Sequence, residues 1–243
     1  MEKKNRKEML DKKNFYINGK WVSPTEPRNY KVIDPSNEEA CAEISLGGKK
    51  DVDKAVGAAK KAFSTWAFSK KEERLELLEK LYVIYKKRWA EMAKLITLEM
   101  GAPMKFSTEM QAATGASHIK SFKQVLKDFK FERDLGEEKN NQKLLYEPKG
   151  VCALITPWNW PMNQVSLKVI PALASACTIV LKPSEIAPLS SMLLAEMIDE
   201  AKFPPGVFNL INGDGAITGD ALTGHTDIDM ISFTGSTRAG ALI

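Results

Sequence analysis

Residues 151–185 read VCALITPWNWPMNQVSLKVIPALASACTIVLKPSE, and they carry the clearest indication of the fold class. It begins with the short apolar run 151–155 and ends with a second run at 178–181, before a polar turn. Between the runs, apolar residues recur with a helical period over 164–175. Pro171 predicts a kink or an interruption there, because proline lacks an amide hydrogen. The order strand, helix, strand is typical of a parallel sheet whose strands are connected by helices.

The same alternation continues toward the C-terminus. A helical pattern over 188–201 is followed by the apolar run 207–211, a short helical segment at 215–222 and the apolar run 229–233, after which Ser236 begins another helix. Apolar strands that alternate with helices predict an α/β fold with a doubly wound parallel sheet. Ligands of such sheets bind beyond the carboxyl ends of the strands, so the turns at those ends are where a site is expected.

Upstream of this region, two short segments predict an exposed antiparallel edge. The apolar residues of 15–22 alternate around Asn18-Gly19, a dipeptide typical of a tight hairpin. Residues 31–33 form a second apolar run, and the turn Asp34-Pro35-Ser36-Asn37 follows it.

Apolar residues at helical spacing predict three helices, over 51–66, 71–100 and 106–128. Asp51 is a suitable N-cap for the first helix, while Gly101 and Pro103 end the second. The aromatic and apolar stripe of the second helix indicates core packing rather than a cofactor pocket.

Residues 128–148 predict a long hairpin that projects from the body. Short apolar segments flank the polar loop 134–141. Because an isolated two-stranded hairpin is only marginally stable in water, we expect this one to pack on a partner chain or on another domain.

The composition indicates an ordinary globular protein. The chain has 243 residues, of which 44% are hydrophobic and 27% charged, and the net charge is +4. These values exclude collagen-like, disordered and disulfide-framework classes, and so small a charge indicates no nucleic-acid partner. We expect no secretory signal, no membrane span and a cytoplasmic location. Cys41, Cys152 and Cys177 are widely spaced, which predicts buried thiols in a reducing compartment.

The turn after the first apolar run reads Thr156-Pro157-Trp158-Asn159-Trp160-Pro161. Two prolines make this loop stiff, and the amide of Asn159 is a hydrogen-bond donor. Asn159 either stabilises a developing oxyanion or caps the helix that follows, and the spacing alone favours neither.

The turn after the second run reads Lys182-Pro183-Ser184-Glu185. A lysine and a glutamate three residues apart are able to hold two vicinal hydroxyls, and the carboxylate would repel a 2′-phosphate, as in NAD sites. The alternative is a surface turn with an ion pair.

The two remaining turns are weaker signals by themselves. Residues 212–219 are rich in glycine, which allows the backbone to approach a phosphate closely, but they are not a G-x-G-x-x-G motif. The turn Phe233-Thr234-Gly235-Ser236-Thr237 is able to cap a helix and to donate hydrogen bonds to an anion.

In this order, the four turns resemble those of the NAD(P)-dependent aldehyde dehydrogenase superfamily. The resemblance extends over 15–243 and includes Asp34-Pro35 and the hairpin near residue 140. It implies a Rossmann-like cofactor-binding domain and oxidation of an aldehyde to a carboxylic acid. In that family a cysteine thiolate attacks the aldehyde, hydride passes to the nicotinamide, and a glutamate-activated water hydrolyses the thioester.

The resemblance also implies roles for individual residues. Asn159 becomes the oxyanion donor, and Lys168 becomes a supporting residue of the catalytic site. Cofactor binding, with NAD as the expected cofactor and NADP as the alternative, falls to Ile155, Thr156, Pro157, Trp158, Lys182, Pro183, Ser184, Glu185, Gly215, Gly235, Ser236 and Thr237. No metal site is implied.

The resemblance divides the chain into three parts. Residues 1–127 are the helical and edge-strand part of the cofactor-binding domain, 128–148 are an oligomerisation hairpin, and 149–243 are the Rossmann-like NAD-binding part. The full-length family is expected to form a homodimer or homotetramer.

The family's general base in a Glu-Leu-Gly-Gly segment, and its nucleophile in a Gly-Gln-x-Cys segment, do not occur in this sequence. We therefore expect the chain to be the amino-terminal half of the enzyme, truncated before the catalytic domain and inactive alone.

Two other interpretations stay open. The chain is alternatively a non-catalytic nucleotide-binding or complementing fragment. It is also compatible with a reductase of the same superfamily that acts on acyl-phosphates or acyl-CoA, although the first two turns favour the oxidising, hydrolytic branch. His118 and His225 carry no chemical signal, and His225 is expected to be a loop histidine.

Overall fold

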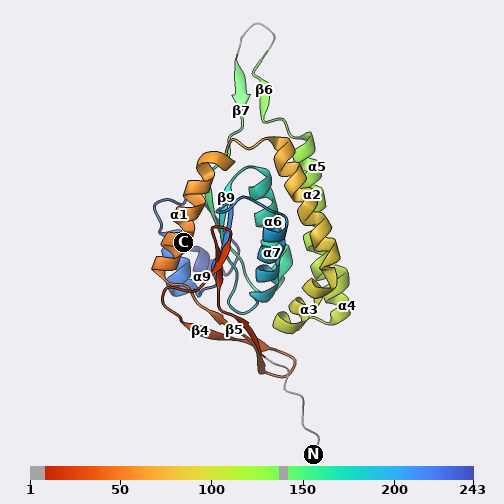
Figure 1. Cartoon of the computed structure of the whole chain (residues 1–243), viewed down its shortest axis with the longest axis vertical. Coiled ribbons are helices and arrows are strands. Elements are labelled where there is room, and N and C mark those ends of the chain that lie inside the picture. The colour runs from red at the N-terminus through yellow and green to blue at the C-terminus, as the bar shows by residue number, and fades with distance from the viewer. Residues whose placement is uncertain (1–8, 137–141) are drawn as a thin grey trace, which may run out of the picture.

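The structure of the chain, a computed structural model, describes residues 9–136 and 142–243. Figure 1 shows the whole chain. Its centre is a six-stranded sheet with the strand order β11-β8-β9-β10-β2-β3. Four strands are parallel: β8 (Val151–Ile155), β9 (Thr178–Lys182), β10 (Phe208–Leu210) and β11 (Met230–Phe233). The doubly wound parallel sheet is therefore confirmed.

The strand order reverses at β8. The chain runs from β8 to β9 and β10 on one side and then returns to place β11 on the other side of β8. Such a reversal separates the helices that follow the two neighbouring strands and leaves a crevice beyond their carboxyl ends.

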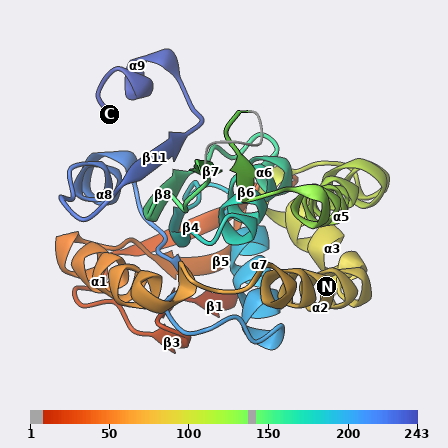
Figure 2. The same cartoon turned by 90° about the horizontal axis from the view of Figure 1, so that it is seen from above.

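Side chains of β8 alternate between two apolar clusters, one on each face of the sheet. Val151, Ala153 and Ile155 pack in a cluster with residues of α1 (Lys49–Trp66) and α8 (Asp220–Thr223). Cys152 and Leu154 pack on the opposite face with residues of α6 (Pro161–Ala174) and α7 (Leu189–Glu200). Figure 2 shows α1 and α7 on opposite sides of the sheet. Burial on both faces explains why these strands are continuous apolar runs.

The predicted hairpin at 15–22 is confirmed, but its expected exposure is wrong. It consists of β2 (Phe15–Ile17) and β3 (Lys20–Val22), and Asn18 and Gly19 between them have φ angles of 53° and 74°. Strand β2 is buried because it pairs antiparallel with β10 and extends the central sheet. Of these two strands, β3 lies at an edge of the sheet, and β11 forms the opposite edge.

A second sheet contains three strands in the order β1-β5-β4. They are β1 (Leu10–Lys12), β4 (Asn29–Asp34) and β5 (Glu39–Ser45). Strands β4 and β5 form an antiparallel pair across the predicted turn at 34–37, and β1 lies parallel to β5.

The predicted helix over 71–100 is two helices, α2 (Lys71–Lys87) and α3 (Trp89–Met100). They meet at Arg88, whose φ and ψ of −96° and 14° are outside the helical region. The Arg88 guanidinium binds Glu91 at 2.7 Å and, on α7, Glu196 at 2.7 Å. The apolar residues keep their helical spacing across Arg88, and the Arg88–Glu196 contact joins residues far apart in the sequence. The sequence pattern therefore did not reveal the break.

Three further helix expectations need correction. Helix α1 begins at Lys49 with Gly48 as its N-cap, and Asp51 lies in the first turn, where its carboxylate accepts from the Gly48 amide at 3.1 Å. The predicted helix over 106–128 consists of α4 (Met104–Phe106), the π-helical turn η1 (Ser107–Gln111) and α5 (Ala112–Asp128). Pro171 does not interrupt α6, and its carbonyl still accepts from Ser175.

The predicted hairpin of residues 128–148 forms β6 (Glu132–Asp134) and β7 (Lys143–Leu145), which project from the body (Figure 1). Residues 137–141 of its polar loop are outside the described residues. At its base, Phe129 stacks edge-on against Phe131 and Tyr146, with ring centroids 4.8 and 5.2 Å away. Arg74 of α2 lies over the Phe131 ring, so the base of the hairpin is anchored on its own chain.

Among the helices that the structure describes, none has the length and apolar character that crossing a membrane requires.

Two glycines on helices provide a matched test of the packing. A Cβ on Gly115 of α5 would lie 2.3 Å from the Tyr85 hydroxyl oxygen, whereas a Cβ on the exposed Gly57 of α1 would meet nothing within 4 Å. We expect Gly115→Ala to lower the free energy of unfolding by about 1–3 kcal/mol through overpacking. Gly57→Ala should raise it by about 0.5–1 kcal/mol, because alanine favours the helix.

Urea unfolding of the two variants, followed by circular dichroism, measures both changes. Equal effects of the two substitutions would contradict the close contact between α5 and α2.

Candidate functional site

The structure brings the four turns to one edge of the sheet. The amide of Thr156, after β8, donates to the carbonyl of Lys182 at the end of β9 at 3.3 Å. On the other side of β8, the amide of Thr234 donates to the carbonyl of Ile155 at 3.1 Å. The Lys182 ammonium donates to the carbonyl of Gly213, after β10, at 2.5 Å. The turns are therefore joined directly to one another.

In the first turn, Thr156 is buried and its hydroxyl has no hydrogen-bond partner within the described residues. Pro157 is half-buried, and Trp158 and Asn159 are exposed. The N-cap of α6 is Trp160, with Pro161 as the first helical residue. The interpretation that Asn159 caps this helix is therefore wrong.

No hydrogen bond of the Asn159 side chain is found in the part of the chain that the structure describes. A rigid loop thus presents an exposed amide at the carboxyl edge of the sheet, where it is able to donate to a ligand.

Lys168 lies on α6, and its side chain points to β11. Its ammonium donates to the Ser232 hydroxyl at 2.9 Å, two residues before Thr234. Partial burial lowers the pKa of Lys168 below its usual value. Lys168 therefore joins α6 to the strand that leads into the fourth turn.

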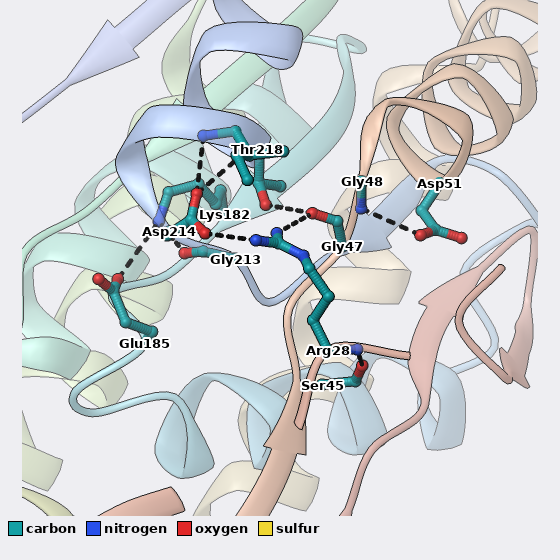
Figure 3. A network of polar contacts seen from close by, with 11 residues as sticks. Arg28, Ser45, Gly47, Gly48, Asp51, Lys182, Glu185, Gly213, Asp214 and Thr218 are labelled. Atoms are coloured by element: carbon teal, nitrogen blue, oxygen red, sulfur yellow. Dashed lines mark hydrogen bonds and ion pairs between the residues drawn. The ribbon is translucent and has the colours of Figure 1, made fainter. Parts of the chain in front are cut away.

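In the second turn, Lys182 is buried with only 5% of its side chain exposed. Its ammonium donates to the carbonyls of Pro183 at 3.1 Å and Gly213, and lies 3.7 Å from a carboxylate oxygen of Glu185 (Figure 3). Burial lowers the pKa of Lys182, and the charges of Glu185 and Asp214 partly offset this effect. Ser184 is buried, and its hydroxyl accepts from the Ile186 amide at 3.3 Å.

The third turn begins the π-helical segment η2 (Gly215–Gly219). Asp214 caps it, because its carboxylate accepts from the amides of Ile217 at 2.7 Å and Thr218 at 3.3 Å. Burial tends to raise the pKa of Asp214, but these hydrogen bonds and the Arg28 guanidinium outweigh it and hold the pKa below its ordinary value. Gly215 is exposed, and a Cβ there would meet nothing within 4 Å, so the backbone is open to a ligand.

The fourth turn leads into α9 (Thr237–Gly240), and Ser236 caps this helix as expected, since its hydroxyl accepts from the Ala239 amide at 3.2 Å. Gly235, Ser236 and Thr237 are all exposed. At Gly235 a Cβ would lie 2.3 Å from the Phe233 ring, so this position requires glycine on steric grounds.

The cysteines lie away from this edge. Cys152 and Cys177 are buried near the amino ends of β8 and β9, at the opposite edge of the sheet. Cys41 is half-buried on β5, and burial raises its pKa to about 11, which makes it a poor nucleophile. His225 is confirmed as a loop histidine, and its ring accepts from the Asp227 amide at 3.1 Å.

Sequence reasoning missed Glu99, which is buried at the end of α3. Its carboxylate accepts from the amides of Leu189 and Ser190, the latter at 3.0 Å. These are the first two residues of α7, and Pro188 before them has no capping side chain. A glutamate from a distant helix therefore caps the helix that follows the Lys182–Glu185 turn. The sequence predicted that the helix ends at Gly101, close to Glu99, but gave no indication of the capping role of Glu99.

These features define a class: a doubly wound α/β protein whose four polar turns meet at the carboxyl edge of the sheet. The comparisons then identify the family. The pattern of the aldehyde dehydrogenase family matches residues 21–243, so the chain belongs to that family.

Its relatives support this at the level of sequence and structure. The chain is 50% identical over 236 residues to 3-succinoylsemialdehyde-pyridine dehydrogenase from a Pseudomonas species, covering 97% of this chain and 49% of that protein. It is 60% identical to an aldehyde dehydrogenase of Bartonella henselae, with a TM-score of 0.93 over 96% of this chain and 49% of that one.

A structure of an aldehyde dehydrogenase C mutant from Pseudomonas syringae, complexed with NAD+ and octanal, is 44% identical with a TM-score of 0.92. It covers 95% of this chain and 47% of that one. The chain thus spans about half the length of the relatives it matches.

The buried carboxyl of Glu99 makes stability depend on pH. Burial raises its pKa from 4.5 to about 7, despite the hydrogen bonds that it accepts. Between these values the native state holds a proton that the unfolded state releases, so the free energy of unfolding falls as pH rises. The change amounts to about 1.4 kcal/mol per pKa unit.

The Glu99→Gln variant lacks this titration and isolates the effect. We expect its free energy of unfolding, minus that of the wild type, to increase between pH 5 and pH 8 in urea titrations. A difference that stays constant or decreases with pH would show that the helix terminus keeps Glu99 ionised.

Proposed function

We propose that the chain is the cofactor-binding half of an NAD-dependent aldehyde dehydrogenase, whose complete form oxidises an aldehyde to a carboxylic acid. The observation that carries this proposal is the Lys182–Glu185 pair at the carboxyl edge, joined through Gly213 to the glycine-rich turn. Relatives with this architecture are solved in complex with NAD+, among them betaine aldehyde dehydrogenase of Staphylococcus aureus, 33% identical with a TM-score of 0.89 over 95% of this chain and 46% of that one.

The residues present are suited to a dinucleotide. Glu185 has 27% of its side chain exposed and is able to accept hydrogen bonds from ribose hydroxyls, beside the Lys182 ammonium as donor. The Thr156 hydroxyl is buried without a partner among described residues, and Gly215 leaves the backbone open. Gly235, Ser236 and Thr237 offer donors to a pyrophosphate. NAD itself supplies the hydride acceptor of the reaction.

Other proposed roles concern the complete enzyme. Asn159 donates to the oxyanion that forms when a nucleophile attacks the aldehyde, and Lys168 holds the helix that follows this loop against β11. The nucleophile and the general base come from outside this sequence. The hairpin of 128–148 contributes to a homodimer or homotetramer, the parts 1–127 and 149–243 form one cofactor-binding domain, and the location is cytoplasmic.

Isothermal titration of the chain with NAD tests cofactor binding. We expect weak binding of NAD and weaker binding of NADP, because the Glu185 carboxylate repels a 2′-phosphate. Glu185→Gln should weaken NAD binding roughly tenfold, through loss of a charge-assisted hydrogen bond, and should reduce the preference over NADP. The exposed Glu200 at the end of α7 provides a control, Glu200→Gln, that should change neither. Absence of heat at millimolar NAD would contradict the proposal.

A second candidate, a complementing or non-catalytic fragment, is favoured by the position of the buried cysteines at the wrong edge of the sheet. Mixing the chain with the second half of wild-type aldehyde dehydrogenase C from Pseudomonas syringae, a mutant of which is solved with octanal, tests complementation directly. We expect no NADH from octanal with the chain alone and NADH formation with both halves.

In the complemented enzyme, Asn159→Ala should lower kcat by about 10²–10³-fold, which is the cost of losing an oxyanion donor.

NADH production by the chain alone would show that the nucleophile is within this sequence. Restored activity would favour a complementing fragment, and failure of the two halves to associate would favour a truncated remnant.

A further inference from the structure

Arg28, in the segment before β4, connects two loops at the carboxyl edge of the sheet. Its Nη1 donates to a carboxylate oxygen of Asp214 at 2.8 Å, and its Nη2 donates to the carbonyl of Gly47 at 2.7 Å (Figure 3). About a third of the Arg28 side chain and a quarter of the Asp214 side chain are exposed, so the ion pair is partly shielded from water. Such an ion pair is worth more than one on the open surface.

Gly47 is pressed against the end of β10. Its carbonyl also accepts from the Thr218 hydroxyl at 2.5 Å, and its amide donates to the carbonyl of Asn212 at 2.8 Å. A Cβ on Gly47 would lie 2.5 Å from a methyl carbon of Ile211, so a larger residue would force this side chain or the loop to shift. The loop before α1 and the glycine-rich turn therefore form one hydrogen-bonded cluster.

Gly213 lies between the two residues that this cluster binds. Asn212 is bound by Gly47, Asp214 is bound by Arg28, and the carbonyl of Gly213 accepts from the Lys182 ammonium. That carbonyl is the nearer of two that accept from the Lys182 ammonium, the other being the carbonyl of Pro183 at 3.1 Å. Arg28 touches neither Lys182 nor Glu185 and acts on them only through the turn.

Arg28 also controls the charge near Lys182. The negative charge of Asp214 acts on the Lys182 ammonium, together with the charge of Glu185. The Arg28 guanidinium, which binds one oxygen of Asp214, offsets part of this negative charge. Without Arg28, the free carboxylate would compete with Glu185 and with ligand hydroxyls for the ammonium.

We propose that Arg28 is a positioning residue of the cofactor site, which acts through Asp214 and Gly47 to hold Lys182 ready for the ribose hydroxyls. This inference rests on the proposed function, since it concerns the same dinucleotide. It adds a residue from the amino-terminal segment to a site otherwise built from turns after residue 155.

A double-mutant cycle, with one change in the protein and the other in the ligand, separates an effect on ligand positioning from an effect on folding. Arg28→Gln, Arg28→Lys and wild-type chains are titrated with NAD and with NAD that lacks the 2′-hydroxyl of its adenosine ribose. We expect Arg28→Gln to weaken the binding of NAD about five- to tenfold and the binding of the deoxy analogue less than twofold. The second effect is smaller because Lys182 has one hydroxyl fewer to bind in the analogue. Arg28→Lys should recover part of the loss, since it keeps one charge but not the two-loop bridge.

Arg88→Gln is the matched control. Arg88 is also an ion-paired arginine, with 24% of its side chain exposed, but it joins α2, α3 and α7 away from the turns. We expect this variant to lower Tm and to leave the affinity for both ligands unchanged. If Arg28→Gln lowered the affinity for both ligands equally, Arg28 would have only a stabilising role and the proposal would be overturned.

A second measurement does not depend on NAD binding. Reductive methylation with formaldehyde and borohydride, followed by mass spectrometry, reports the accessibility of Lys182, with Lys168 as the internal reference. We expect Arg28→Gln to increase the Lys182 rate severalfold relative to Lys168, and Arg88→Gln to leave the ratio unchanged. An unchanged ratio in Arg28→Gln would overturn the proposal. If the wild-type chain bound no NAD, the proposed function would fail while this labelling still decided the role of Arg28.

Discussion

Strands β8 and β9 bury all of their side chains, and the rest of the structure follows from covering both of their faces. Helix α1 with α8 covers one face, and α6 with α7 covers the other. Because each parallel strand requires a crossover that returns the chain to the same end, every turn that follows a strand comes to one edge. The proposed chemistry is located there for this reason, and the buried cysteines at the opposite ends of the strands are excluded from it.

The same edge is held by polar contacts between segments far apart in the chain. Arg28 and Gly47 bind the glycine-rich turn, and Glu99 caps the helix after the Lys182 turn. Each of these groups is wholly or partly removed from water, and such groups are costly unless they are partnered. The amino-terminal segments therefore do more than cover the sheet, because Arg28, Gly47 and Glu99 also hydrogen-bond to the segments at this edge.

The chemical groups along this edge are of the kinds that form hydrogen bonds and ion pairs. The chain offers donors, one buried ammonium and one accessible carboxylate, which are groups that bind and orient. The chain belongs to the aldehyde dehydrogenase family and spans about half the length of the relatives it matches. The projecting hairpin has an aromatic base anchored on α2, which leaves its strands free to meet other surfaces.

Four features were predictable from the amino-acid sequence: the parallel sheet, the hairpin at Asn18-Gly19, the cap at Ser236 and the order of the four turns. Each of these depends on residues adjacent in the chain, whose spacing and backbone preferences act locally. Tertiary structure alone decided the break at Arg88, the burial of β2, the failure of Asn159 to cap α6 and the cluster around Gly47. Arg28 and Asp214 are 186 residues apart, and Arg88 and Glu196 are 108 apart. No local pattern specifies such pairs, because they form only when packing of the apolar faces has brought their elements together.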